Sequence, residues 1–155
     1  MINNDVLRSI RYTLDLSDKK ISEIIQLAGG EIASADIAPL LKKEDEEGFV
    51  DCDDAIMLAF LDGLIIDKRG KLEPRPDHAR QAESRLTNNI ILKKLRVAFE
   101  LKDADMHDTL ELAGFNVSKP ELSALFRAKG HKNYRACGDQ LLRNFLKGLA
   151  MRTRG

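Results

Sequence analysis

Hydrophobic residues recur three or four positions apart in four successive segments of the first 70 residues. These segments are expected at about 4–16, 18–29, 37–41 and 54–68. In the first of them one helix face is formed by Val6, Leu7, Ile10 and Leu14. No stretch alternates apolar and polar residues as a half-buried strand does. The pattern therefore predicts an all-α protein.

The second part of the chain repeats the first at a constant offset of 85 residues. Residues 3–70 align with 88–155 without a gap, and 18 of the 68 aligned positions are identical. On the helix faces most mismatches exchange one apolar residue for another, so the four helix faces are kept. The chain is therefore predicted to be a tandem duplication of two four-helix pseudo-repeats, 1–70 and 88–155. The prolines and alternating charges of 71–87 are typical of a solvated linker.

Several helix ends carry sequence signals. The second segment of each repeat begins near Asp18 or Asp103, whose carboxylates are suited to cap free backbone N–H groups. The same segments are expected to stop at Gly29 and Gly114, because glycine tolerates the left-handed conformation that ends many helices. Ser118 and Glu121 have the spacing of a capping box.

Composition and length place the chain among folded globular proteins. Hydrophobic residues make up 43% and charged residues 32% of its 155 positions. Aromatic residues are only 5%, with no Trp, which disfavours a carbohydrate platform or an array of base-stacking side chains. The longest apolar stretch, 55–61, is too short to span a bilayer, and the first residues lack the pattern of a secretory signal. We therefore expect a cytoplasmic protein.

Four motifs carry a resemblance to a known family. They are Asn3-Asn4-Asp5-Val6-Leu7-Arg8, Lys42-Lys43-Glu44-Asp45-Glu46-Glu47-Gly48-Phe49, Phe60-Leu61-Asp62-Gly63-Leu64-Ile65 and Asn133-Tyr134-Arg135-Ala136-Cys137-Gly138-Asp139-Gln140. In these motifs and in its duplication the chain resembles the YehS-like family, whose repeated domain is known as domain of unknown function 1456. The resemblance implies a small cytoplasmic bacterial protein and implies no activity, cofactor or catalytic residue.

Charge separates the two repeats. Residues 1–70 hold 8 basic and 15 acidic side chains, a net charge of −7, whereas 88–155 hold 13 and 7, a net charge of +6. The contrast is sharpest just before the fourth segment. There the first repeat has an acidic run, which consists of Glu44, Asp45, Glu46 and Glu47. The candidate anion or nucleic-acid contacts of the second repeat are Arg127, Lys129, His131, Lys132, Tyr134, Arg135 and Arg143.

This asymmetry has three interpretations. The charges are solubilising side chains on exposed loops, or the basic loop contacts phosphates with help from N–H groups at the start of the fourth helix, or the acidic loop binds a basic partner or another copy. The second and third segments also loosely resemble a helix-turn-helix, with Lys119, Arg127 and Lys129 exposed on the third segment of the second repeat.

The fourth segment of the first repeat is more apolar than its counterpart. Leu58 and Ile65 stand where the second repeat has Arg143 and Ala150. Seven residues apart, they extend one side of the helix, and such a face needs covering. The cover is expected to be the other half of the chain, with a second copy or a partner as alternatives.

Two recurring polar pairs are candidates for structural ion pairs. Arg11 and Arg96 lie beside the apolar stripe of the first segment, and Asp54 and Asp139 recur at the start of the fourth. We expect each arginine to form a partly buried ion pair or to cap carbonyl groups, with an anion site as the alternative.

Candidate chemistry is sparse. Cys52 and Cys137 precede a helix N-terminus, which lowers a thiol pKa, yet a small buried hydrophobic role is favoured for both. The acidic run does not match a calcium-binding loop, the three histidines are scattered, and no catalytic motif occurs. We therefore predict no metal, no cofactor and no enzyme. The predicted function is a protein-interaction or regulatory module, and nucleic-acid binding by the second repeat is the alternative.

Overall fold

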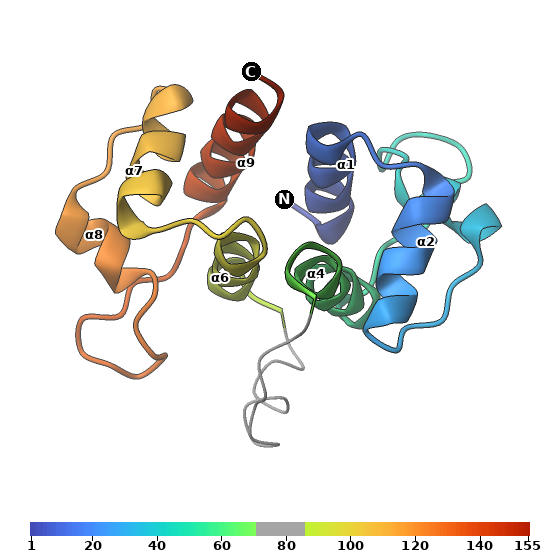
Figure 1. Ribbon diagram of the computed structural model, residues 1–155, viewed down its shortest axis with the longest axis horizontal. Helices are drawn as coiled ribbons and strands as arrows, with labels where there is room; N and C mark the ends of the chain where they lie inside the picture. Colours follow the sequence, from blue (N-terminus) through green and yellow to red (C-terminus); the bar gives the residue numbers. More distant parts are fainter. Residues whose placement is uncertain (71–85) are drawn as a thin grey trace.

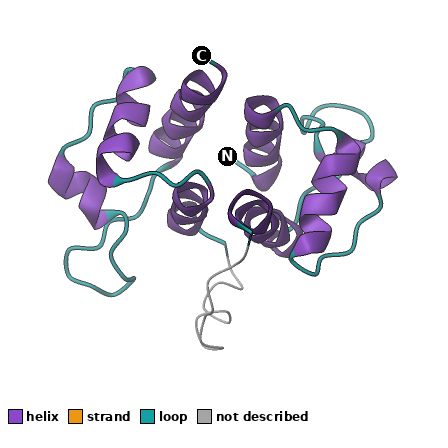
Figure 2. Ribbon diagram, viewed as in Figure 1, coloured by secondary structure: helices purple, strands orange, loops and turns teal. Residues whose placement is uncertain are grey.

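The computed structural model describes residues 1–70 and 86–155, and all regular structure in these residues is helical (Figure 2). The helices of the first repeat are α1 (Asn3–Leu14), α2 (Asp18–Leu27), a 3₁₀ turn (Ser34–Asp36) leading into α3 (Ile37–Leu40), and α4 (Asp54–Arg69). Those of the second repeat are α6 (Asn88–Ala98), α7 (Asp103–Leu112), α8 (Lys119–Ala124) and α9 (Asp139–Arg154). The prediction of an all-α tandem duplication is confirmed. Residues 71–85 of the predicted linker lie outside the described part of the chain.

The first helix of each repeat ends at a left-handed residue. Helix α1 stops at Leu14, two residues earlier than predicted, because Asp15 has a φ of 54°. Glu100, its equivalent after α6, has the same φ. The second helices end at Leu27 and Leu112, two residues before the predicted glycines, and Gly29 and Gly114 take the left-handed conformation expected there, with φ values of 87° and 76°.

The capping residues are partly those that the sequence indicates. Ser17 rather than Asp18 caps α2, and its hydroxyl accepts a hydrogen bond from the backbone N–H of Lys20 at 3.0 Å. The equivalent cap position before α7 is Lys102 instead of Asp103. The prediction therefore places each aspartate one position too early. Each is the first helical residue, and the helix dipole stabilises its carboxylate there. The capping box of α8 is confirmed, with Ser118 and Glu121 bonding reciprocally.

The fourth helix of each repeat crosses the second through a glycine. Helix α4 packs on α2 and α9 packs on α7. A Cβ on Gly63 would collide with the carbonyl oxygen of Ile24, and one on Gly148 would collide with that of Thr109. Glycine therefore permits the close approach that builds each core.

The two repeats pack around a pseudo-twofold axis. Helix α1 lies along α9 and α4 lies along α6, so the first helix of each repeat contacts the fourth helix of the other (Figure 1). At one of these contacts the buried ammonium of Lys94 donates to Asp62 at 2.7 Å. At the other, Arg154 donates to the carbonyl of Tyr12 at 2.8 Å and lies 4.4 Å from the centre of its ring.

This packing covers the apolar side of α4. Leu58 and Ile65 lie four residues before and three residues after Asp62, on the side of the helix that faces Lys94 of α6. Ile65 is only 4% exposed, and Leu58 is half-buried. On this side of α4, Ile65 is therefore not available as a free partner surface, whereas Leu58 keeps part of its surface exposed.

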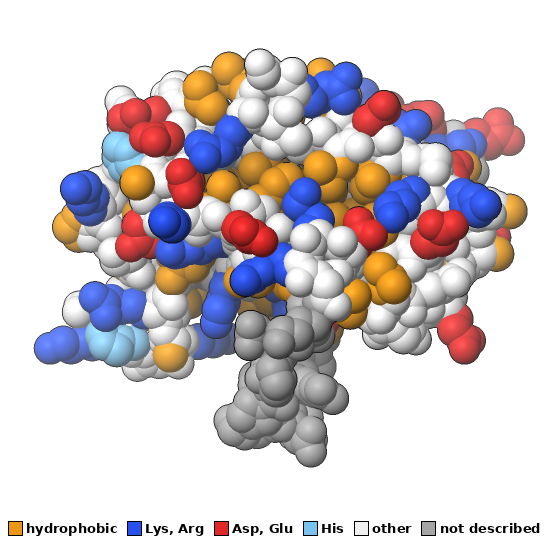
Figure 3. All heavy atoms as spheres, viewed as in Figure 1, with side chains coloured by type: hydrophobic (Ala, Val, Ile, Leu, Met, Phe, Trp, Pro, Cys, Tyr) orange, Lys and Arg blue, Asp and Glu red, His pale blue; other side chains and the backbone are white. Residues whose placement is uncertain are grey.

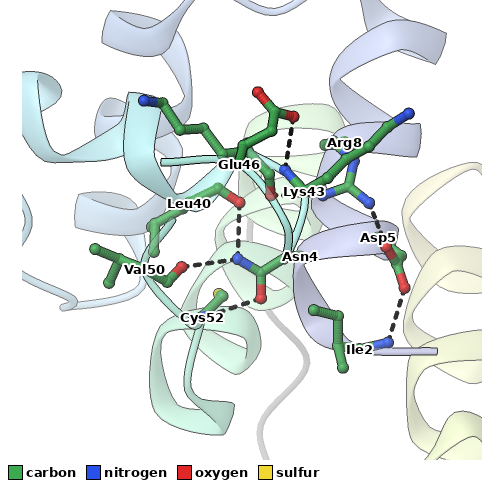
Figure 4. A network of polar contacts seen from close by, with 10 residues as sticks. Ile2, Asn4, Asp5, Arg8, Leu40, Lys43, Glu46, Val50 and Cys52 are labelled. Atoms are coloured by element: carbon green, nitrogen blue, oxygen red, sulfur yellow. Dashed lines mark hydrogen bonds and ion pairs between the residues drawn. The ribbon is translucent and has the colours of Figure 1, made fainter. Parts of the chain in front are cut away.

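The pairs of adjacent asparagines hold the long loops in place. The amide nitrogen of Asn4, a fully buried residue, donates to the carbonyls of Leu40 and Val50, both at 2.9 Å, and its oxygen accepts from the N–H of Cys52 at 3.0 Å (Figure 4). One side chain on α1 thus fixes both ends of the loop between α3 and α4.

The second repeat builds the same clamp. Asn89 donates to Leu125 at 3.0 Å and to Arg135 at 2.9 Å, and accepts from Cys137 at 2.8 Å. Because an unsatisfied buried amide, carbonyl or N–H is costly, the three bonds of each asparagine specify the loop's path.

The other asparagine of each pair holds an aspartate that also bonds toward the other half of the chain. Asn3 donates to Asp54 at 2.8 Å, and Asp54 also accepts from the backbone N–H of Leu86, two residues before α6, at 3.2 Å. In the reciprocal arrangement Asp139 accepts from Asn88 at 2.8 Å and from the amino terminus at 3.0 Å. The Asn88 bond first, and the terminal amine next, hold the pKa of the Asp139 carboxyl below its usual range.

The Asn4 clamp predicts an asymmetric loss of stability. In Asn4→Ala the carbonyl of Leu40 and the N–H of Cys52 are left buried without a partner, so the free energy of unfolding should fall by about 3 kcal/mol or more. Asn89→Ala should cost less, because part of its bonding takes place near solvent. Urea unfolding monitored by circular dichroism measures both. Equal losses below about 1 kcal/mol would contradict the clamp.

Candidate functional site

The basic side chains predicted for the second repeat gather around α8 and the loop after it. Arg127, Lys132, Tyr134 and Arg135 line a groove of about 720 Å³, together with Lys119 at the start of α8. Figure 3 shows Lys and Arg side chains gathered at the lower left of the molecule, over the loop that follows α8 in Figure 1. We call this hollow the basic groove.

The structure separates the predicted residues into two groups. Lys129 and His131 lie on the same exposed loop but do not line the basic groove, and Arg143 lies on α9. Lys119 joins the groove although it was set apart as part of a helix-turn-helix. The Asn89 clamp turns the loop back toward α8 and so places Arg135 in the same groove as Lys119.

Most cations of the basic groove are available to a ligand. The side chains of Lys119, Arg127 and Lys132 are exposed and make no hydrogen bond or ion pair with the described residues. Arg135 pairs with Glu121 at 3.0 Å, and the Ser118 bonds first, then this arginine, hold the pKa of Glu121 below its usual range. One carboxylate thus accompanies four cations.

The corresponding surface of the first repeat has different chemistry. Ser34, Lys42, Glu47 and Val50 occupy the positions of Lys119, Arg127, Lys132 and Arg135. The scaffold beneath is the same, because Val50 donates to Pro39 at 3.2 Å as Arg135 donates to Ala124 at 3.1 Å. The duplication therefore presents one basic and one nonbasic version of a single loop.

The acidic run Glu44–Glu47 forms an exposed turn. Glu46 accepts from the N–H of Lys43 at 2.9 Å, and the Lys42 ammonium donates to the carbonyl of Glu47 at 2.7 Å. This turn belongs to the first repeat, and the basic groove lies across the molecule on the second (Figure 1). The four carboxylates remain open to solvent.

The recurring arginines do not pair with the recurring aspartates. Arg96 donates to the Leu101 carbonyl at 3.0 Å and to Asp103 at 2.7 Å, and it lies over the ring of Phe126. Arg11 is exposed. The expected partners Asp54 and Asp139 are instead engaged by Asn3 and Asn88, which reach them from the start of the first helix.

The two cysteines are buried thiols. Cys52 is 2% and Cys137 is 6% exposed, and both are free. Burial first, and the neighbouring aspartates next, raise the pKa of the Cys52 thiol to about 12. Burial and Asp139 raise that of Cys137 to about 11. Neither thiol has the environment of a nucleophile.

One group of side chains in the described residues has donors suited to a metal ion. His107, Asp108 and Glu111 on α7 place three ligand atoms within 4.8 Å of one another. His107 lies 3.6 Å from Glu111, and both carboxylates are exposed. A histidine and a glutamate four residues apart on an exposed helix face also pair without any metal.

A helix-turn-helix does not fit the geometry of the second repeat. Helix α8 has six residues, about 9 Å at the rise of an α-helix, which is short for a helix that reads a major groove. Its cations instead share the basic groove with the following loop.

Fold and site together define a class of protein: an all-α tandem duplication whose halves pack as a pseudo-dimer and differ in surface charge. Residues 3–70 and 88–155 each match the family model described as "Protein of unknown function (DUF1456)". The chain is 50% identical over 152 residues to "Uncharacterized protein YehS" of Escherichia coli (strain K12), covering 98% of this chain and 96% of that protein. The chain therefore belongs to the DUF1456 family. No solved structure matches it.

Within the described residues, no helix has both the length and the apolar character required to span a membrane.

The raised thiol pKa values predict slow labelling by a disulfide reagent. At pH 8 both thiols should be almost entirely protonated, because their pKa values of about 12 and 11 lie far above that pH. The reagent 5,5′-dithiobis(2-nitrobenzoate) should label native protein at least a hundredfold more slowly than urea-unfolded protein. Native thiols reacting as fast as unfolded ones would show that the sites are open.

Proposed function

We propose that this protein is a non-enzymatic binding module of the bacterial cytoplasm and that its basic groove binds the phosphate backbone of a nucleic acid. The observation that carries the proposal is the convergence of Lys119, Arg127 and Lys132, exposed and without partners among the described residues, in one groove. Lysine and arginine side chains supply most contacts to nucleic-acid phosphates.

The contrast between the repeats supports this assignment. Charges that serve only solubility need no particular placement, yet here the cations replace Ser34, Glu47 and Val50 on a loop whose backbone bonds are otherwise the same. These three differences, together with Arg127, which stands opposite Lys42, place four cations in one groove and produce a positive field at one end of the molecule. Such a field attracts polyanions and accelerates their association.

The protein-partner hypothesis keeps only its polar part. Its apolar residue Ile65 is only 4% exposed, whereas the acidic run Glu44–Glu47 remains exposed. A basic protein would be the partner of that turn. Glu44→Lys/Glu47→Lys would disrupt this contact and leave nucleic-acid binding intact, which separates the two hypotheses.

The basic groove predicts binding that is sensitive to salt. Labelled 20-nucleotide DNA or RNA should bind the full-length protein in 50 mM NaCl, measured by fluorescence anisotropy. Neutralising three phosphates implies an affinity loss of about 20-fold to 40-fold between 50 and 200 mM salt. Arg127→Glu/Lys132→Glu should weaken binding at least tenfold.

A matched control keeps the net charge equal. Lys19→Glu/Lys43→Glu reverses two exposed lysines of the first repeat and should leave the affinity unchanged. Thermal melting establishes that both double variants fold. Equal weakening by the two variants would mean that total charge matters and the groove does not, and no binding at about 100 µM protein would refute the proposal.

A further inference from the structure

A second hollow adjoins the basic groove. It measures about 300 Å³ and lies between the loop after α7 and the start of α9. Arg135 and Glu121 line both hollows, so their 3.0 Å ion pair lies at the boundary. A ligand lying in the basic groove therefore has the second hollow within reach. We call it the side pocket.

The lining of the side pocket combines apolar and amide groups. The half-buried side chains of Phe115 and Leu141 and the nearly buried Val117 contribute apolar surface. Asn116 and Gln140 contribute side-chain amides that are exposed and make no hydrogen bond to the described residues. A few polar groups around an apolar lining are characteristic of small-ligand sites.

This chemistry suits a nucleobase. A base has a flat apolar face, which packs on an aromatic ring, and an edge of donors and acceptors, which an amide matches because it offers both. The side pocket supplies one ring and two amides, enough for a single base and too little for a run of stacked bases.

The side chains that give this pocket its chemistry are different at the equivalent positions of the first repeat. Gly30 stands in place of Phe115, which removes the aromatic ring. Glu31, Asp51 and Asp53 stand in place of Asn116, Ala136 and Gly138. Three carboxylates would repel a phosphate held nearby. Aromatic ring, amides and cations thus occur together in the second repeat only.

We infer that the nucleic acid bound by this protein is single-stranded and that one of its bases enters the side pocket. This inference rests on the proposed function, since the basic groove holds the adjoining phosphates. Bases within a duplex are stacked and paired and do not reach such a pocket, whereas an unpaired base turns outward at little cost.

The test compares oligonucleotides with and without bases. A single-stranded 12-mer of thymidine and a 12-mer of abasic sites carry the same phosphates, so the difference in their affinities measures the contribution of the bases. By fluorescence anisotropy in 50 mM NaCl the thymidine probe should bind at least tenfold tighter, and a 12-base-pair duplex should bind no better than the abasic probe.

A filled pocket should abolish the difference. Gly138 lines the side pocket, has an ordinary φ of −75°, and has open space where a Cβ would lie, so Gly138→Met should fold. This variant should bind both 12-mers with the affinity of the abasic probe. Ala55→Met, at an exposed position of the first repeat, is the control and should bind like the parent protein. Phe115→Leu provides a second test. It should weaken binding of the thymidine 12-mer and leave the affinity for the abasic 12-mer unchanged.

The outcomes separate the two proposals. If both 12-mers bind with equal affinity, or the duplex binds more tightly than the thymidine 12-mer, the inference about the base is overturned and phosphate binding still stands. Binding of none of the three probes would overturn the proposed function as well.

Discussion

The arrangement of each repeat depends on the hydrogen bonds of one asparagine amide on its first helix, which is Asn4 in the first repeat. Its three hydrogen bonds connect α1 to the end of α3, to the returning loop and to the start of α4. Asn89 repeats the connection in the second half. Since the clamp uses only backbone groups of the loop, the loop's side chains are free to differ. A fixed frame with exchangeable loop residues explains how one duplication presents an acidic turn at one end and a basic groove at the other.

The interface between the repeats also keeps its bonding geometry while its side chains differ. Asp54 and Asp139 each accept one bond from their own repeat; Asp54 accepts a second from Leu86, just before α6, and Asp139 a second from the amino terminus, just before α1. Even an ion pair within the repeats is kept with its signs exchanged. Lys20 and Asp67 join α2 to α4 at 2.9 Å, and the equivalent positions, Asp105 and Arg152, join α7 to α9 at 3.1 Å. The geometry is therefore preserved while the charge of each half changes.

Much of the fold could be predicted from the sequence because duplication tests each pattern twice. Helix faces and the glycine ends recur at the same offset, which distinguishes them from chance. What the sequence left open depends on tertiary packing: Arg96 forms the expected partly buried ion pair and caps the Leu101 carbonyl, but its partner is Asp103, while Asp139 is held by Asn88. Most of the basic groove was visible as a charged loop, but the side pocket was not. Phe115 and Gln140 meet there only after α7 and α9 have packed, and neither belongs to a charge pattern.

The binding half of the molecule can be located directly by nuclear magnetic resonance. A single-stranded thymidine 12-mer is titrated into ¹⁵N-labelled protein, and the backbone amide shifts are followed residue by residue. If the second repeat carries the site, the shift changes will cluster in α8, the loop after it and the first turn of α9. The amide shifts of the first repeat will then remain unchanged. Shifts centred on Glu44–Glu47, or spread along the interface between α1 and α9, would contradict a binding surface on the second repeat.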